Sequence, residues 1–224
     1  MLTGFYHSSV IQYFDGSLRS RQTVTKDNTT GNTVVAETIY DLQGRPNIQI
    51  LPTPTLNSTI KYFKDFNRFI GQGTNDPAKY FDLTPIAVLC NRTLALDSNY
   101  GNGKYYSNQN PWLTIDSNAK YIPDAKGFAF TETRFMDDAT ERVRSQGGVG
   151  IDHQIGSGHE TKYYYGKPSQ NELDALFATE VGDASHYSKN MVRDANGQMS
   201  VSYVDMHGRT IATALAGDTT SGIS

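Results

Sequence analysis

The side chains best suited to chemistry are five histidines, a serine between two glycines and a pair of adjacent carboxylates. The histidines are His7, His153, His159, His186 and His207. A zinc-hydrolase helix would need the pattern H-E-x-x-H, but Tyr163 stands where the second histidine should follow His159 and Glu160. We therefore expect ordinary hydrogen-bonded histidines, no metal site and no cofactor.

The serine and the carboxylates do not form a recognisable catalytic pattern either. Ser157 lies directly between its glycines, whereas a nucleophile elbow needs them two residues away on each side. Asp137 and Asp138 offer the two acids of glycoside hydrolysis, but neighbours on a strand face opposite ways, so we expect this pair in a turn. The sequence thus predicts no catalytic residue and no enzyme. A hydrolase with an unrecognised site is kept as a third hypothesis.

Composition excludes several other classes of function. The net charge of −3 gives no reason to expect a nucleic-acid partner, and no apolar run approaches the roughly 20 residues of a membrane span. The first residues lack the basic start and apolar core of a signal peptide, so any export would be directed from elsewhere. Cys90 is the only cysteine and reads as a core thiol within the strand-like run 86–90.

A short pattern recurs in place of a catalytic motif: aspartate, two variable residues, glycine and arginine, with a tyrosine just ahead. Its two full copies are Tyr40, Asp41, Gly44 and Arg45, and Tyr203, Asp205, Gly208 and Arg209. Weaker copies run from Asp15 to Arg19, from Asp138 to Arg142 and from Asp194 to Gln198. Aspartate accepts hydrogen bonds from backbone N–H groups two residues on, and glycine tolerates positive φ. Each copy therefore predicts a hairpin turn, with the arginine as a cross-strand partner for acids or tyrosine rings.

The elements around these turns read as strands. Residues 33–40, 47–51 and 198–204 are rich in strand formers, and the last of these alternates over seven residues. The sequence predicts a mainly β fold of antiparallel hairpin repeats with one or two short helices. We divide it into hairpin repeats at 1–52, a loop-rich insertion at 53–127 and further repeats at 128–224.

Two helices are considered. Apolar residues at three- and four-residue steps over 60–70 suggest a short amphipathic helix, although Tyr62 keeps an extended segment possible. Ser169 and Glu172 have capping-box spacing and precede an apolar stripe of Leu173, Leu176 and Phe177, which predicts a helix over about 170–180.

The two full turns resemble the YD repeats of RHS-repeat proteins, the group that includes bacterial polymorphic toxins, the C subunits of Tc insecticidal toxins and animal teneurins. The blocks 105–112, 146–150, 158–166 and 203–217 are similar to the region ahead of the main repeat array in Bacteroidetes-type RHS proteins. The resemblance implies a spiralling β-sheet that forms a hollow shell around a C-terminal toxin or effector, without catalysis in this portion.

The same resemblance implies a partner and a location. The partner would be the remainder of the same polypeptide with its enclosed domain, and the location would be secreted or on the surface of a bacterium. We accordingly expect the chain to be a fragment of a larger protein. The alternative is a cell-surface module that binds a glycan or a protein, because flat rings with polar tips suit sugar faces. The rings in question are Tyr105, Tyr106, Trp112 and Tyr163 to Tyr165.

Overall fold

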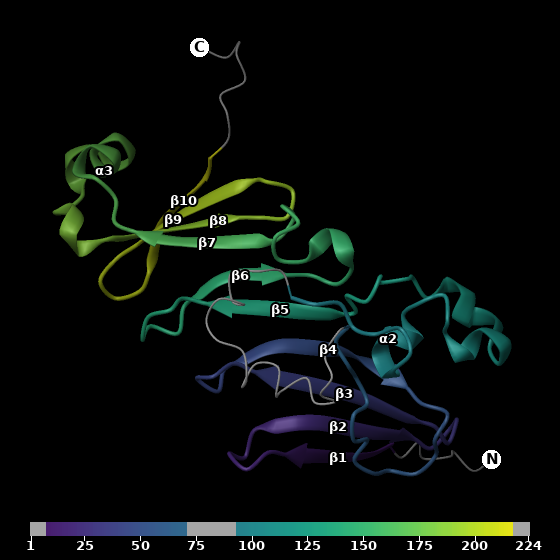
Figure 1. Ribbon diagram of the computed structural model, residues 1–224. Coiled ribbons are helices and arrows are strands. Elements are labelled where there is room, and N and C mark those ends of the chain that lie inside the picture. Colours follow the sequence, from purple (N-terminus) through teal and green to yellow (C-terminus); the bar gives the residue numbers. More distant parts are fainter. Residues whose placement is uncertain (1–7, 71–92, 217–224) are drawn as a thin grey trace, which may run out of the picture. The chain divides into compact units, whose positions relative to one another are not determined.

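The computed structural model describes residues 8–70 and 93–216. The strand-like run 86–90 and Cys90 lie outside these residues. The strands are β1 (Ser8–Phe14), β2 (Ser20–Asp27), β3 (Thr33–Tyr40), β4 (Pro46–Pro54), β5 (Phe130–Phe135), β6 (Val143–Gly147), β7 (Thr161–Gly166), β8 (Ser188–Arg193), β9 (Met199–Val204) and β10 (Thr210–Ala216). They form an antiparallel sheet in sequence order (Figure 1). The expected mainly β fold with antiparallel hairpins is therefore confirmed, while the spiralling shell stays a prediction.

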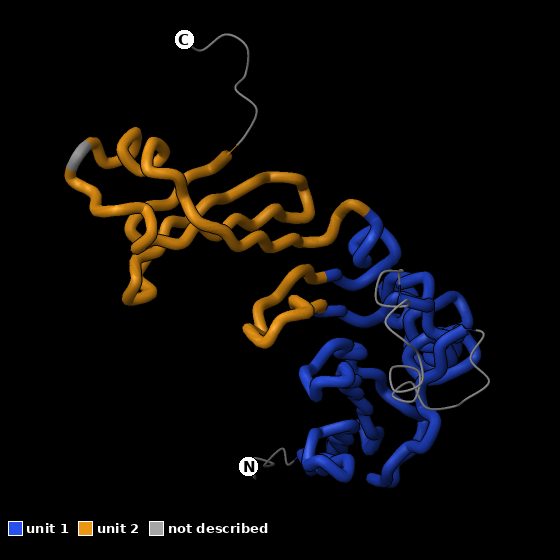
Figure 2. Tube along the Cα trace, turned by 60° about the vertical axis from the view of Figure 1, so that its left-hand side comes forward, with its two compact units in different colours: residues 1–133, 147–157 blue, residues 134–146, 158–224 orange. Residues whose placement is uncertain are grey.

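The chain divides into two compact units, which Figure 2 colours separately. Unit 1 comprises residues 1–133 and 147–157, and unit 2 comprises residues 134–146 and 158–224. The described residues of the insertion expected at 53–127 belong to unit 1, together with the first four strands.

The apolar core of unit 1 lies on one face of its strands. β2, β3 and β4 place alternate aliphatic residues on this face, and the register sets Val24 opposite Val35 and Ile39 opposite Ile48. Phe130 is fully buried, and its ring packs edge-on at 6.2 Å from that of Phe69. The main cluster consists of Ile39, Ile48, Ile50, Phe69, Leu96, Phe128 and Phe130.

The helix suggested over 60–70 is wrong. This segment runs without regular structure to an isolated bridge between Phe69 and Leu96. The side chain of Gln22 on β2 determines its path, because Gln22 Oε1 accepts the Phe63 N–H at 2.8 Å and Nε2 donates to the Phe63 carbonyl at 3.1 Å. The same Nε2 donates to Glu37 at 2.7 Å. The buried Gln22 side chain therefore hydrogen-bonds both the N–H and the carbonyl of Phe63, in place of the backbone hydrogen bonds that a helix would make there.

The helix of this region instead lies further along the chain. α2 (Gly101–Tyr105) packs against β4 (Figure 1). The fully buried Asn102 fixes it there. Asn102 Nδ2 donates to the Leu51 carbonyl at 2.7 Å and to Thr53 Oγ1 at 2.9 Å. A β-carbon on Gly103 would lie 2.4 Å from the Asp97 carbonyl oxygen, so this close approach requires glycine. Two 3₁₀ turns follow, η2 (Pro111–Thr114) and η3 (Ser117–Tyr121).

Unit 2 pairs β7 to β10 in order and carries one α-helix, α3 (Gln170–Phe177). Its predicted start is confirmed, because the Ser169 side chain accepts the Glu172 N–H at 3.2 Å. Leu173 is fully buried with Val201 and Tyr203, whereas Leu176, expected on the apolar stripe, is 48% exposed. The eight-residue helix thus contacts the sheet through a narrower stripe than the sequence suggested. Within residues 8–70 and 93–216, no helix has the length and apolar character needed to cross a bilayer.

Candidate functional site

The two full sequence repeats form the same turn. Asp41 Oδ1 accepts the N–H groups of Gln43 and Arg45, each at 2.9 Å, while its Oδ2 accepts Arg45 Nε at 2.7 Å. Asp205 repeats this pattern with His207 and Arg209, at 2.9 Å for both N–H groups and 2.8 Å for Nε. One carboxylate therefore holds two backbone donors and its own arginine, which aims that arginine across the strand.

Glycine provides the left-handed conformation in these turns, with φ of 82° at Gly44 and 78° at Gly208. Two of the weaker copies keep this conformation without glycine, because Leu18 has φ of 59° and Glu141 has φ of 55°, while the third has Gly197 with φ of 87°. The Asp15 turn is otherwise complete, and Asp15 accepts the N–H and Nε of Arg19 at 3.0 and 2.8 Å. The turn predicted for the Asp15 copy is therefore present, with the same hydrogen bonds and with leucine in place of glycine.

The two tyrosines of the repeat are not equivalent. Tyr40 directly precedes its aspartate, whereas one residue separates Tyr203 from Asp205. Because side chains alternate along a strand, the two tyrosines lie on opposite faces of their strands when the two turns are superimposed. Ile39, and not Tyr40, holds the position of Tyr203, and both Ile39 and Tyr203 are buried.

Tyr40 takes part in a cross-strand contact with the preceding hairpin. β2 and β3 pair as far as Gln22 and Glu37, and Arg19 and Tyr40 each lie three residues beyond this pair. The Arg19 guanidinium sits 5.1 Å from the centre of the Tyr40 ring. The Tyr40 hydroxyl donates to the carbonyl of Ser20, the residue after Arg19, at 3.0 Å.

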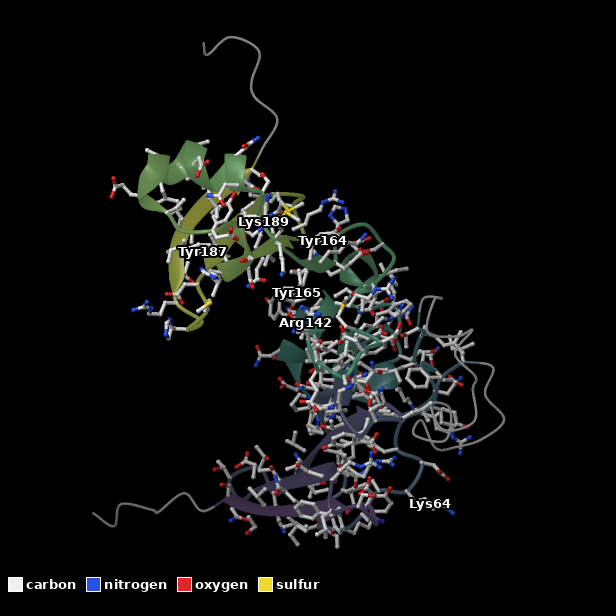
Figure 3. The ribbon with its side chains drawn as sticks, turned by 90° about the vertical axis from the view of Figure 1, so that its left-hand side faces the viewer. Lys64, Arg142, Tyr164, Tyr165, Tyr187 and Lys189 are labelled. Carbon is white, nitrogen blue, oxygen red and sulfur yellow. The ribbon has the colours of Figure 1, made fainter. Side chains whose placement is uncertain are left out.

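The same arrangement recurs in unit 2. Arg142 lies 4.7 Å from the centre of the Tyr165 ring, and the Tyr165 hydroxyl donates to the carbonyl of Val143 at 2.9 Å. Figure 3 shows the two labelled side chains together. β6 and β7 pair at Ser145 and Lys162, and Arg142 and Tyr165 each lie three residues beyond this pair, as Arg19 and Tyr40 do beyond theirs. We call this combination of a ring contact and a hydroxyl bond to the next carbonyl the Arg–Tyr pair.

Tyr203 makes a related contact, in which a lysine and a glutamate take the place of the arginine. Its hydroxyl and Lys189 Nζ both donate to Glu172 Oε1 on α3, and Lys189 lies 5.9 Å from the Tyr203 ring centre. Burial, followed by the bond to Glu172, raises the pKa of Tyr203 to about 12. Lys189 and then Tyr203 lower the pKa of Glu172. The group therefore keeps a neutral phenol and an ionised carboxylate, which dock α3 on β8 and β9.

The turn carboxylates also keep their charge in the folded chain. The N–H of Arg209 is the largest influence on Asp205 and lowers its pKa, and the Arg209 side chain adds to this effect. Burial acts to raise the pKa of Asp15, but the hydrogen bonds from Arg19 and Ser17 outweigh it and leave the pKa lowered. At Asp138 the Thr140 hydroxyl has the largest effect and lowers the pKa. Each of these acids is engaged as an acceptor.

Several of the rings considered for sugar binding make contacts within the fold. Tyr105 and Tyr106 meet at 89° instead of forming one flat surface, and the Tyr106 hydroxyl donates to the Pro52 carbonyl at 3.0 Å. Trp112 has its ring N–H buried without a hydrogen-bond partner. In unit 2, the Tyr163 hydroxyl donates to Gln146 at 2.7 Å.

The histidines do not gather into a centre among the residues that the structure describes. No group of three or more His, Cys, Asp or Glu side chains there has the geometry of a metal site. His159 Nδ1 lies 2.9 Å from the Ala195 carbonyl, and Asp138 lies in a turn. His7 lies outside the described residues.

Sequence reasoning named the turn residues and expected turn arginines to contact tyrosine rings, but it did not match Arg19 with Tyr40 or Arg142 with Tyr165. The signal that would have found them is the spacing from each turn arginine to a later tyrosine. Tyr40 comes 21 residues after Arg19, and Tyr165 comes 23 residues after Arg142. Such spacing spans one strand, one connection and the next strand.

A family model described as a domain of unknown function (DUF6443) matches residues 5–85. This stretch includes β1 to β4 with the turns of Asp15 and Asp41. A search of curated proteins found no match to the chain.

Proposed function

We propose that this chain is a structural segment of a large RHS-type protein, secreted or displayed by a bacterium. Its strands contribute wall to a β-sheet shell that encloses a C-terminal toxin or effector, and the segment carries out no catalysis of its own. Its partners are the remainder of the same polypeptide and the enclosed domain.

The observation that carries the proposal is the recurrence of the Arg–Tyr pair, once in each unit. The pair joins the strand that leaves one aspartate turn to the strand that follows it, at Arg19 with Tyr40 and at Arg142 with Tyr165. A contact that recurs between one hairpin and the next allows a sheet to extend by repetition, as in other repeat proteins. The turn carboxylates and the tyrosine hydroxyls form the hydrogen bonds that hold these turns and pairs together.

The edge strands support the same proposal. Among the described strands, β1 pairs only with β2 and β10 only with β9. Both edges carry exposed apolar side chains, which include Val10 and Phe14 on β1 and Leu215 on β10. Free-standing sheet proteins usually protect their edges with charge, proline or bulges, whereas an internal wall segment gains its protection from its neighbours.

The isolated 224-residue chain is therefore expected to self-associate through its edges. Sedimentation velocity across micromolar concentrations should show species that grow with concentration. A double variant, Val10→Lys with Leu215→Lys, should return the chain to a monomer because lysine discourages edge pairing.

Leu42→Lys is the matched control, because Leu42 is an exposed apolar residue at a turn. It should leave the association unchanged. A stable monodisperse monomer at all concentrations, or a loss of association with Leu42→Lys equal to that of the edge variant, would contradict the proposal.

A further inference from the structure

Arg209 is held like the arginines of the Arg–Tyr pairs, but no tyrosine ring among the described residues completes its contact. Its Nε and Nη2 bind Asp205 Oδ2 at 2.8 and 2.7 Å, so the arginine is held as in the other turns. Its side chain is nevertheless 75% exposed, against 35% for Arg19 and 41% for Arg142, whose guanidinium groups lie over tyrosine rings. Arg209 therefore has the geometry of the Arg–Tyr pair without the ring.

The position of Arg209 defines where the missing ring would lie. Arg19 and Arg142 directly precede β2 and β6. The tyrosine lies at or next to the end of the strand that pairs with the far edge of β2 or β6, Tyr40 as the last residue of β3 and Tyr165 as the last but one of β7. Arg209 directly precedes β10 in the same way. The far edge of β10 has no partner strand among the described residues, and Thr213 to Ala216 are exposed there.

We propose that the free edge of β10 is a docking site for an antiparallel β-strand that ends in tyrosine, with Arg209 as the residue that selects it. The ring stacks on the Arg209 guanidinium, and the hydroxyl donates to the carbonyl of Thr210, the counterpart of Ser20 and Val143. This inference deepens the proposed function, on which it rests, by naming the chemistry of the strand that extends the wall.

Selection by Arg209 follows from the physical character of the pair. Backbone bonds along the edge accept any extended peptide, so they give affinity without discrimination. A cation over an aromatic ring and a hydroxyl-to-carbonyl bond both add affinity that depends on the terminal side chain of the strand. Both are absent for a strand that ends in alanine, and the hydroxyl bond is absent for phenylalanine.

The probe is a fluorescent, C-terminally amidated peptide with the sequence of residues 33–40, the strand that completes the pair at Arg19. Amidation removes a carboxylate that would otherwise attract Arg209. Binding to the full chain is followed by anisotropy, below the concentration at which the chain self-associates. Hydrogen exchange then locates the bound peptide.

We expect slowed amide exchange in β10 and an affinity that depends on the terminal residue. Replacing the peptide's tyrosine by alanine should weaken binding about 5- to 30-fold, with phenylalanine in between. In the protein, Arg209→Ala removes the ring contact and leaves the Thr210 carbonyl in place, so it should weaken binding of the tyrosine peptide, by a smaller factor than the alanine peptide loses. Arg209→Lys keeps the charge but loses the planar stacking group, so it should also bind more weakly.

Arg144→Ala is the matched control, because Arg144 is an exposed arginine of the same unit on the internal strand β6. It should not change the affinity. Equal binding of tyrosine and alanine peptides, equal binding by Arg209→Ala, or β10 exchange that the peptide does not slow would overturn the proposal. The proposal would also be overturned if a second copy of the chain stayed bound at the β10 edge in the presence of saturating tyrosine peptide.

The outcomes separate this inference from the proposed function. Edge-mediated self-association without any dependence on Arg209 would leave the wall proposal standing and remove the selective site. Tyrosine-dependent binding at β10 in a chain that stays monomeric would do the reverse.

Discussion

Replacing Phe130 with alanine is expected to lower the free energy of unfolding of unit 1 by about 3 to 5 kcal/mol. Phe130 is fully buried at the centre of the apolar cluster and contacts the rings of Phe69 and Phe128. Truncation removes that burial and leaves a cavity that neighbours on β3 and β4 fill only in part, because their positions are fixed by the sheet.

Urea unfolding followed by tryptophan fluorescence measures this loss, since Trp112, the single tryptophan, belongs to unit 1. Phe14→Ala on the edge strand β1 is the matched control and should change the stability by less than about 1 kcal/mol, because Phe14 is largely exposed. A loss at Phe130 no greater than that at Phe14 would show that the cluster is not the core of unit 1.

Gln22→Ala should cost about 2 to 4 kcal/mol, an unusually large effect for a polar residue. The buried Gln22 side chain binds the N–H and the carbonyl of Phe63 and one oxygen of Glu37. Alanine leaves these groups without that partner, and the desolvation penalty of each buried polar group then counts against the folded state.

Hydrogen exchange provides a specific readout, because the Phe63 amide should exchange faster in Gln22→Ala than in the parent chain. Gln49→Ala is the control, since Gln49 is an exposed glutamine on β4. It should change the stability by about 0.5 kcal/mol or less. An unchanged Phe63 exchange rate would contradict the role given to Gln22.

The features that local sequence predicts are those that local chemistry determines. The aspartate turns follow from hydrogen bonds within five residues, so Asp41 and Asp205 identify them directly. The start of α3 follows from the hydrogen bond that the Ser169 side chain accepts from the N–H of Glu172, three residues later. Alternation of apolar and polar residues likewise identifies β9.

The features that sequence missed depend on distant partners. Residues 60–70 have a helical spacing of apolar side chains, but Gln22, 41 residues from Phe63, holds them in another conformation. Leu18 and Glu141 adopt positive φ because the hydrogen bonds around them require it, against their own preference. The Arg–Tyr pair joins residues more than 20 positions apart, which a turn motif alone does not connect.

Amide hydrogen exchange at the edge strands β1 and β10 tests the central claim most directly, if it is measured in the polypeptide that the natural reading frame encodes and in the isolated chain at high dilution. Since exchange from a paired strand requires local opening, both strands should exchange at least about tenfold more slowly in the natural polypeptide. Equally fast exchange of β1 and β10 in both samples would contradict the claim that neighbouring strands complete this sheet.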